Sequence, residues 1–203
     1  MRLILASSSP RRRELLCQLG LDFEIIKPEI DESRRAGEAL VDYVRRLSRE
    51  KAEAVVQALG AAPALVISAD TIVILAADTI GVAESGDLLG KPADAADARH
   101  MLKRLRGRGH DVITAFTLYR HGAGQRVITR QERTIVHMRD FSDAEIDAYV
   151  ATGDPLDKAG GYAIQNEAFR PVARIEGSYS NVVGLPIEAL RAAMKEIGMD
   201  MAS

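Results

Sequence analysis

Hydrophobic and polar positions alternate along the chain with the two periods that are typical of helices and strands. Residues 64–76, ALVISADTIVILA, form a nearly continuous aliphatic run, which predicts a strand covered on both faces at the centre of a sheet. Residues 38–59 repeat their apolar side chains with a helical period and predict the longest helix. Shorter strands are expected at 2–6, 23–27 and 162–165, a further ordered segment near 172–176, and shorter helices at 10–19, 94–105 and 186–197.

Two further patterns complete the predicted fold. Alternating segments 111–120 and 125–139 flank the sequence HGAG, which predicts an antiparallel hairpin. Ser142 and Glu145 have the spacing of a capping box and predict another helix. Because strands and helices intermix along the chain, we expect an α/β fold with a mixed sheet. Without a repeat or a low-complexity linker, residues 1–203 are expected to form a single domain.

Composition narrows the classes of protein to which the chain can belong. With a formal net charge of −2, the whole molecule has no positive field for a nucleic-acid backbone or an anionic membrane, so anion binding must be local. The single cysteine, Cys17, cannot form an intramolecular disulfide, and its apolar helical setting predicts a buried structural thiol. No long apolar run or signal-peptide pattern is present, so we expect a cytoplasmic location without a membrane partner.

Two charged residues interrupt apolar patterns. Asp70 lies within the 64–76 run, where a carboxylate is costly unless it is paired, hydrogen-bonded or bound to a metal. It either caps a turn at a strand end or serves as a metal ligand or general base. Lys51 lies on the buried face of the 38–59 helix. Either its side chain extends along the edge of the core so that the ammonium reaches solvent, or the ammonium has a functional role.

Residues 3–16, LILASSSPRRRELL, predict a local anion-binding site. A strand, a serine-rich turn and a helix N-terminus together present backbone N–H groups and hydroxyls to an anion. Arginines in the first helical turn oppose the helix dipole by about 0.3–1 kcal/mol each, and a bound polyphosphate removes this conflict. The alternative is a basic surface patch, as in a phosphoacceptor or nuclear-targeting segment. The segment is neither a Walker loop nor a G-x-G-x-x-G motif.

Eight segments together carry a family resemblance. In chain order they are LILASSSPRRRELL, DE at 31–32, LSREKA, SADTIV, LGKP, GHDVIT, GDPLDKAGGYAIQ and GSYSNVVGLP. They cover nearly the whole chain and resemble the Maf family of nucleoside triphosphate pyrophosphatases, first described as septum-formation inhibitors. The resemblance implies an elongated mixed β-sheet with flanking helices and a deep central cleft, as in the inosine triphosphatase-like Maf/Ham1 fold. It also implies a homodimer. Under this resemblance the single domain either is undivided or consists of two lobes around one cleft.

The resemblance also implies an activity. Family members hydrolyse the bond between the α and β phosphates, give a nucleoside monophosphate and pyrophosphate, and require a divalent metal cation, Mg²⁺ or Mn²⁺. KAGGYAIQ resembles the subfamily that acts on dTTP, UTP and modified uridine nucleotides, whereas the 7-methyl-GTP subfamily typically has tryptophan where Arg11 stands. The alternatives are a 7-methyl-GTP pyrophosphatase and a non-catalytic nucleotide-binding regulator of cell division and septum formation.

Roles for individual residues follow from the same resemblance. Asp70 is the expected general base, with Lys51 and Lys91 in the catalytic set. Metal binding is expected from Glu32 and Asp70. The expected phosphate-binding residues are Ser7, Arg12, Lys51, Lys91 and Lys158, and the expected specificity positions are Arg11, Thr71 and Gln165.

Three residues or segments stand outside these roles. His110 lies in a matching segment but at a predicted strand start, which is typical of a structural histidine. The loop at 76–88 is longer than the family pattern, and Asn166 follows Gln165 where a glycine is usual.

Overall fold

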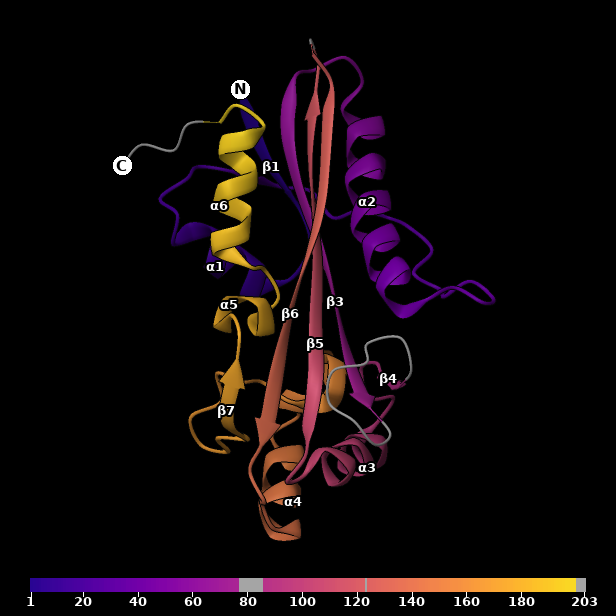
Figure 1. Ribbon diagram of the computed structural model, residues 1–203, viewed down its shortest axis with the longest axis vertical. Helices are drawn as coiled ribbons and strands as arrows, with labels where there is room; N and C mark the ends of the chain where they lie inside the picture. Colours follow the sequence, from indigo (N-terminus) through magenta and orange to yellow (C-terminus); the bar gives the residue numbers. More distant parts are fainter. Residues whose placement is uncertain (77–85, 123, 200–203) are drawn as a thin grey trace. The chain divides into compact units, whose positions relative to one another are not determined.

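The computed structural model of the chain describes residues 1–76, 86–122 and 124–199 (Figure 1). The strands are β1 (Arg2–Ala6), β2 (Glu24–Ile25), β3 (Ala64–Ala76), β4 (Gly86–Leu89), β5 (Gly109–His121), β6 (Arg126–Met138) and β7 (Val172–Glu176). The helices are α1 (Pro10–Cys17), α2 (Leu40–Leu59), α3 (Ala95–Leu105), α4 (Asp143–Ala151), α5 (Tyr179–Val183) and α6 (Ile187–Glu196), with short 3₁₀ turns η1 (Asp154–Asp157) and η2 (Ala159–Gly161).

Within the described ranges, seven strands form one mixed sheet. Its order is β2-β1-β3-β5-β6-β7, and β4 pairs with β3. β1 runs parallel to β2 and β3, whereas β4 is antiparallel to β3 and β7 is antiparallel to β6. The α/β class, the mixed sheet and the interior position of β3 are therefore confirmed.

The chain divides into two compact units. Unit 1 contains residues 1–70, 114–132 and 184–203, and unit 2 contains residues 71–113 and 133–183. Strands β3, β5 and β6 are each divided between the two units, with one part in unit 1 and the other in unit 2. No helix in the described part of the chain is both long enough and apolar enough to cross a membrane.

In unit 1, α2 packs on β1 and β3. Its side chains Ala52, Val55 and Val56 form a buried cluster with Ile4, Ala6, Ala64 and Val66. In Figure 1, α6 lies on the other side of these strands. Small polar side chains permit the close approach of α2: Ser48 Oγ lies 2.8 Å from Thr117 Oγ1 on β5, and the Ser68 hydroxyl donates to the Ser48 carbonyl. These buried bonds fix α2 against β3 close to Lys51 and Asp70.

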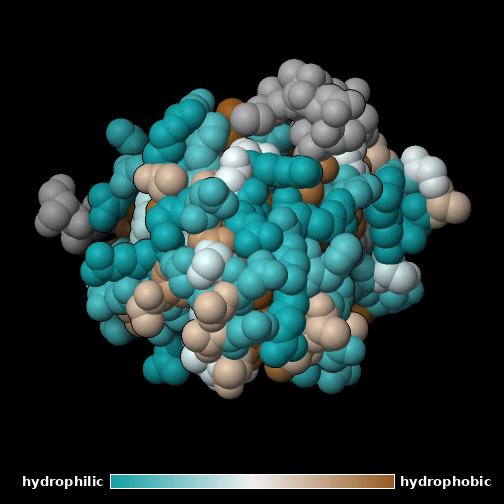
Figure 2. Space-filling view, turned by 90° about the horizontal axis from the view of Figure 1, so that it is seen from below, coloured by the Kyte–Doolittle hydropathy of each residue, from teal (hydrophilic) through white to brown (hydrophobic). Residues whose placement is uncertain are grey.

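In unit 2, helices α3 and α4 pack together around an aromatic cluster. The rings of Tyr149 and Phe169 stack with their centroids 4.4 Å apart, and Phe141 lies 4.8 Å from Phe169. The face that carries these helices is predominantly hydrophilic (Figure 2). Ion pairs such as Arg99–Asp147 and Lys103–Asp143 join α3 to α4 there, and such exposed pairs stabilise a fold only weakly.

The structure corrects several sequence predictions. The strand expected at 162–165 is not formed: residues 162–163 have no regular structure, and residues 164–165 lie in a turn that the Asn166 amide closes on the Ala163 carbonyl. Cys17 is exposed, since the two-turn helix α1 buries only Leu15 and Leu16 and Cys17 is its last residue. The strand expected at 23–27 is reduced to β2. Of the long loop at 76–88, residues 86–88 begin β4, which the sequence did not predict, and residues 77–85 lie outside the described residues. The short helix α5 was also missed.

His110 is buried at the start of β5, as the structural interpretation requires. Its Nε2 lies 2.7 Å from the Tyr162 hydroxyl, and its Nδ1 has no hydrogen-bond partner among the residues that the structure describes. Burial, with a smaller contribution from His137, lowers the pKa of His110 to about 3. The neutral imidazole is therefore the form that the fold stabilises.

This burial makes the stability of the fold depend on pH. Because the pKa is lower in the folded than in the unfolded state, the contribution of His110 is complete above about pH 6.5 and is lost as the pH falls toward 3. We expect the free energy of unfolding to fall by about 1.4 kcal/mol per pH unit in this window. Urea titrations of wild type, His110→Gln and the exposed control His100→Gln test this. A slope shared by all three proteins would contradict it.

Candidate functional site

The turn between β1 and α1 is built to present hydrogen-bond donors. Ser7 is 5% exposed, and its Oγ accepts a hydrogen bond from the Ser9 amide at 3.1 Å. Ser9 in turn caps α1 by accepting from the Arg12 amide at 3.4 Å, and Pro10 occupies the first helical position. Ser9 is thus the N-cap of α1. Since the first turn of α1 contains no acidic residue, its positive end is left for an anion.

Arg12 is held from two sides within unit 1. Its Nε donates to the Gly184 carbonyl at 2.8 Å, and its Nη1 makes a longer contact of 3.5 Å with Ser7 Oγ. Burial lowers the pKa of Arg12, while the negative charges of Asp70 and Glu32 oppose this effect and the charge of Arg11 adds to it. The Arg12 guanidinium is therefore fixed in place and electrostatically coupled to both predicted metal ligands.

Lys51 lies between the two predicted metal ligands. Its Nζ is 2.5 Å from Asp70 Oδ1 and 2.9 Å from Glu32 Oε1. The Lys51 side chain is 8% exposed and that of Asp70 is 13% exposed, whereas Glu32 is largely open to solvent. A buried ammonium requires such compensation. The structure thus brings together three predicted site residues from the loop before α2, from α2 and from β3.

Tyr43 contacts the same site, although the sequence analysis did not identify it. Its hydroxyl donates to the Glu32 carbonyl at 2.8 Å. Burial raises the pKa of Tyr43, and the charges of Asp70 and Glu32 raise it further. Tyr43, Leu47 and Lys51 follow one another at intervals of four residues on α2, so helical spacing could have indicated Tyr43.

Arg46 fixes the loop that carries Glu32. Its guanidinium binds both carboxylate oxygens of Glu38 at 2.6 and 2.9 Å, the Glu50 carboxylate at 2.9 Å and the Ser33 carbonyl at 3.0 Å. The hydrogen bonds from Arg46 are the main cause that lowers the pKa of Glu38 to about 2. Arg46 and Glu50 are four residues apart, so the sequence could have indicated this ion pair on one face of the helix. The bond between Arg46 and Glu38 could be identified only from the structure.

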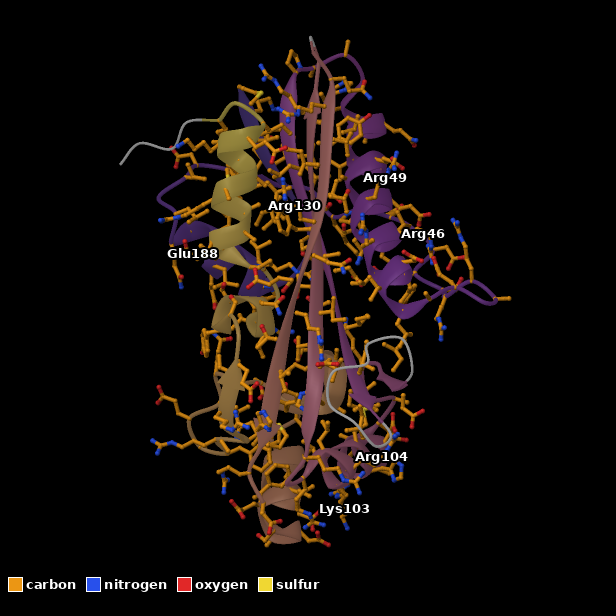
Figure 3. All side chains as sticks on the ribbon, in the orientation of Figure 1. Arg46, Arg49, Lys103, Arg104, Arg130 and Glu188 are labelled. Carbon is orange, nitrogen blue, oxygen red and sulfur yellow. The ribbon has the colours of Figure 1, made fainter. Side chains whose placement is uncertain are left out.

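We expect Arg46→Lys to loosen residues 31–38, because lysine cannot reproduce the paired geometry of a guanidinium. Hydrogen exchange of the Ser33 amide should accelerate about tenfold, as expected when hydrogen bonds to charged groups are lost. Arg49→Lys is the matched control, since Arg49 is an exposed arginine on the same helix as Arg46 (Figure 3). Arg49 pairs with Glu53, which lies outside residues 31–38. Equal exchange in the two variants would show that Arg46 does not hold the loop.

Unit 2 holds the remaining predicted lysines. Lys91 is exposed in the loop after β4, and the Gly160 amide donates to the Gly90 carbonyl at 3.0 Å, which joins the LGKP and KAGG segments. Lys158 is 8% exposed, and its Nζ binds the Asp154 carbonyl at 2.5 Å and the carboxylates of Asp154 and Asp157 at 2.9 and 2.5 Å. Three acceptors match the three donors of an ammonium. Phosphate binding by Lys158 would require these bonds to open.

The predicted specificity positions differ in exposure. Gln165 is exposed and lines a groove of about 430 Å³ in unit 2, together with Asn166, Arg170, Arg174 and Tyr179. Thr71 is half-buried in β3 directly after Asp70, and Arg11 is half-buried in the first turn of α1.

Glu32 and Asp70 fit the donor chemistry of a hard divalent cation. Both present carboxylate oxygens close to one nitrogen atom, where Lys51 already compensates negative charge. Magnesium is commonly bound through one or two carboxylates and completes its ligand shell with phosphate oxygens and water. No cluster of three or more His, Cys, Asp or Glu suited to a metal occurs in the described ranges. The donor set therefore suits an ion that a phosphate ligand helps to hold.

Comparison with known proteins agrees with the segment pattern. The family model described as "Maf-like protein" matches residues 2–197. A protein of Hahella chejuensis named dTTP/UTP pyrophosphatase is 47% identical over 202 residues, covering 100% of this chain and 95% of the relative. One of Geotalea uraniireducens with the same name is 46% identical over 199 residues, covering 97% and 95%. The Ham1 protein of Staphylococcus aureus shares the fold, with a TM-score of 0.51, 15% identity and coverage of 97% and 100%.

Proposed function

Because the chain belongs to the Maf family, we propose that it hydrolyses dTTP and UTP to the nucleoside monophosphate and pyrophosphate. Relatives that bear this activity in their names match nearly the full length of the chain. The observation that carries the proposal is the ammonium of Lys51 between two carboxylates, next to a half-buried arginine at a helix N-terminus. This combination suits a ligand that brings both phosphate oxygens and a metal ion.

Substrate phosphates are bound through donors of known geometry. A triphosphate carries a charge of about −4 and needs several cations. Arg12 can bind two oxygens at once, and the β1–α1 turn adds the Ser7 hydroxyl and the amides of the first helical turn. Lys51 supplies a further positive charge. Lys91 is an exposed candidate for the same function, and Lys158 is a candidate once its acidic partners release it.

Asp70 is the proposed general base. It takes the proton of the water that attacks phosphorus, while Lys51 compensates the charge of the carboxylates. Glu32 and Asp70 would hold the divalent cation, Mg²⁺ or Mn²⁺, which when bound lowers the pKa of water and neutralises phosphate charge. Arg12 and Lys51 orient the phosphates, because phosphoryl transfer depends mainly on positioning and charge neutralisation. The chain needs no nucleophilic side chain for this reaction.

Base selection is assigned to Arg11, Thr71 and Gln165. The amide of Gln165 can accept from N3–H and donate to O4 of uracil or thymine, and the hydroxyl of Thr71 offers a further donor or acceptor. A purine such as 7-methylguanine presents a different edge. These three positions are therefore proposed to favour pyrimidine nucleotides.

The test is pyrophosphate release from dTTP, UTP, CTP, GTP and 7-methyl-GTP with Mg²⁺, Mn²⁺ or EDTA. We expect hydrolysis of dTTP and UTP that depends on the metal. Preference for 7-methyl-GTP would overturn the assignment of the specificity positions. Absence of all hydrolysis would favour a nucleotide-binding regulator of septum formation, and equilibrium dialysis against labelled nucleotide would then measure that binding. Light scattering tests the expected homodimer, which stays a prediction, as does the cytoplasmic location.

A further inference from the structure

Glu32, one of the two proposed metal ligands, is held to helix α2 through its backbone and through its carboxylate. The Glu32 carbonyl accepts from the Tyr43 hydroxyl at 2.8 Å, and the next carbonyl, that of Ser33, accepts from Arg46 at 3.0 Å. The Glu32 carboxylate lies 2.9 Å from Lys51 Nζ. Tyr43, Arg46 and Lys51 all belong to α2, so a single helix holds this part of the loop and the end of its acidic side chain.

The Tyr43 bond acts on the peptide unit next to the Cα of Glu32. The carbonyl of Glu32 and the amide of Ser33 share one planar peptide unit, and that amide donates to Asp31 Oδ1 at 2.8 Å. Both polar groups of the unit are therefore hydrogen-bonded. Because the carbonyl carbon is bonded to the Glu32 Cα, holding the unit holds the point from which the side chain extends. With the carboxylate bonded to Lys51, Glu32 is fixed at both ends.

The ring of Tyr43 has contacts that do not depend on its hydroxyl. It is half-buried on α2, and the guanidinium carbon of Arg46 lies 5.6 Å from the ring centroid. A cation over an aromatic face contributes about 0.5–1 kcal/mol at such exposed positions. Phenylalanine keeps this contact, so Tyr43→Phe removes the bond to the Glu32 carbonyl and leaves the ring in place.

We propose that Tyr43 is a positioning residue for the metal ligand Glu32, whose backbone it holds where the carboxylate can share a cation with Asp70. This inference rests on the proposed function, in which these two carboxylates hold a divalent cation. A ligand residue that is already ordered raises affinity, because less conformational entropy is lost on binding. Magnesium also demands near-ideal ligand geometry, which makes its binding sensitive to the placement of one carboxylate.

The test measures the Mg²⁺ concentration that gives half-maximal dTTP hydrolysis in wild type and Tyr43→Phe. We expect this concentration to rise about threefold to tenfold in the variant, the effect of one lost hydrogen bond. At saturating Mg²⁺, kcat should stay within about twofold of wild type, because the reacting groups are untouched. Excess metal thus restores turnover, which it would not do for a protein with general damage.

Tyr119→Phe is the matched control for this variant. Tyr119 is another half-buried tyrosine of unit 1, and its hydroxyl accepts from the Gln125 amide at 2.6 Å. Its loss should leave the Mg²⁺ requirement at the wild-type value. An equal rise in both variants would overturn the specific role of Tyr43.

Two measurements report the same link without substrate. Hydrogen exchange of the Ser33 amide should accelerate about threefold to tenfold in Tyr43→Phe, because this amide belongs to the peptide unit that loses its bond. The Mg²⁺ concentration that raises the melting temperature by a given amount should increase by a similar factor.

A double-mutant cycle shows whether Tyr43 acts through Glu32. Glu32→Ala removes the carboxylate but keeps the backbone carbonyl that Tyr43 binds. If Tyr43 works by placing this carboxylate, adding Tyr43→Phe to Glu32→Ala should not change the melting-temperature shift that Mg²⁺ produces. A further loss as large as that seen in the presence of Glu32 would overturn the proposed positioning.

The outcomes distinguish this inference from the proposed function. Wild type that hydrolyses no nucleotide, but whose melting temperature rises with Mg²⁺, overturns the hydrolysis alone, and the thermal measurement then decides the role of Tyr43. Wild type that shows no response to Mg²⁺ in either measurement overturns the metal site and the role of Tyr43 together. A wild type that responds to Mg²⁺, with an unchanged Mg²⁺ requirement in Tyr43→Phe, overturns the role of Tyr43 alone.

Discussion

Asp70→Asn is expected to lower pyrophosphate release from dTTP by at least about 100-fold, the usual loss when a general base is removed. Asparagine keeps the shape of the side chain but cannot take a proton or offer two anionic oxygens to a metal ion. Lys51 keeps its second partner, Glu32, so the fold should persist. Initial rates at saturating metal, measured beside the melting temperature of each protein, check this expectation.

The matched control for that variant is Asp147→Asn. Asp147 is an exposed aspartate that pairs with Arg99 on the surface of unit 2, and its loss should leave the rate within about twofold of wild type. Near wild-type turnover by Asp70→Asn would refute the role of Asp70. A large loss in both variants would point to general damage rather than to a missing base.

The sequence predicted those elements whose signals are local. The run at 64–76 forms β3 with the predicted bounds, and the capping box of Ser142 and Glu145 is present at α4. Strand β4 was missed because its residues lie in a loop-like stretch of the sequence. They form a strand by pairing with β3, and this pairing is not visible in the local pattern. The strand predicted at 162–165 was wrong because the Ala163 amide donates to the Tyr149 hydroxyl and the Ala163 carbonyl accepts from the Asn166 amide, and short-range patterns do not reveal these bonds.

The site shows the same division between local and distant signals. The cost of charge in apolar patterns indicated that Asp70 and Lys51 need compensation, and the structure shows that they compensate each other. The sequence could not show that Gly184 holds Arg12, because every residue has a backbone carbonyl that can accept a hydrogen bond and the residue type does not indicate which carbonyl is used. Arg46 was also missed, since its main partner, Glu38, lies outside the helix that carries it.

The second large effect is expected for Lys51→Met, which keeps the length of the side chain and removes its charge. The carboxylates of Glu32 and Asp70 would then face each other without compensation. Removing one partner of a fully buried ion pair costs about 3–5 kcal/mol, and the exposure of Glu32 reduces the expected loss of unfolding free energy to about 1–3 kcal/mol. Turnover should fall at least about 100-fold, because a phosphate-binding charge is lost as well.

Thermal unfolding with and without Mg²⁺ gives this prediction a readout besides activity. If Glu32 and Asp70 are the metal ligands, the cation replaces the lost ammonium, so Mg²⁺ should raise the melting temperature of Lys51→Met more than that of wild type. Lys103→Met is the control, since Lys103 pairs with the exposed Asp143 on unit 2 and its removal should leave the response to Mg²⁺ unchanged. Equal responses in all three proteins would show that the two carboxylates do not form a metal site, whereas a selective response would locate the ion at Glu32 and Asp70 independently of the reaction.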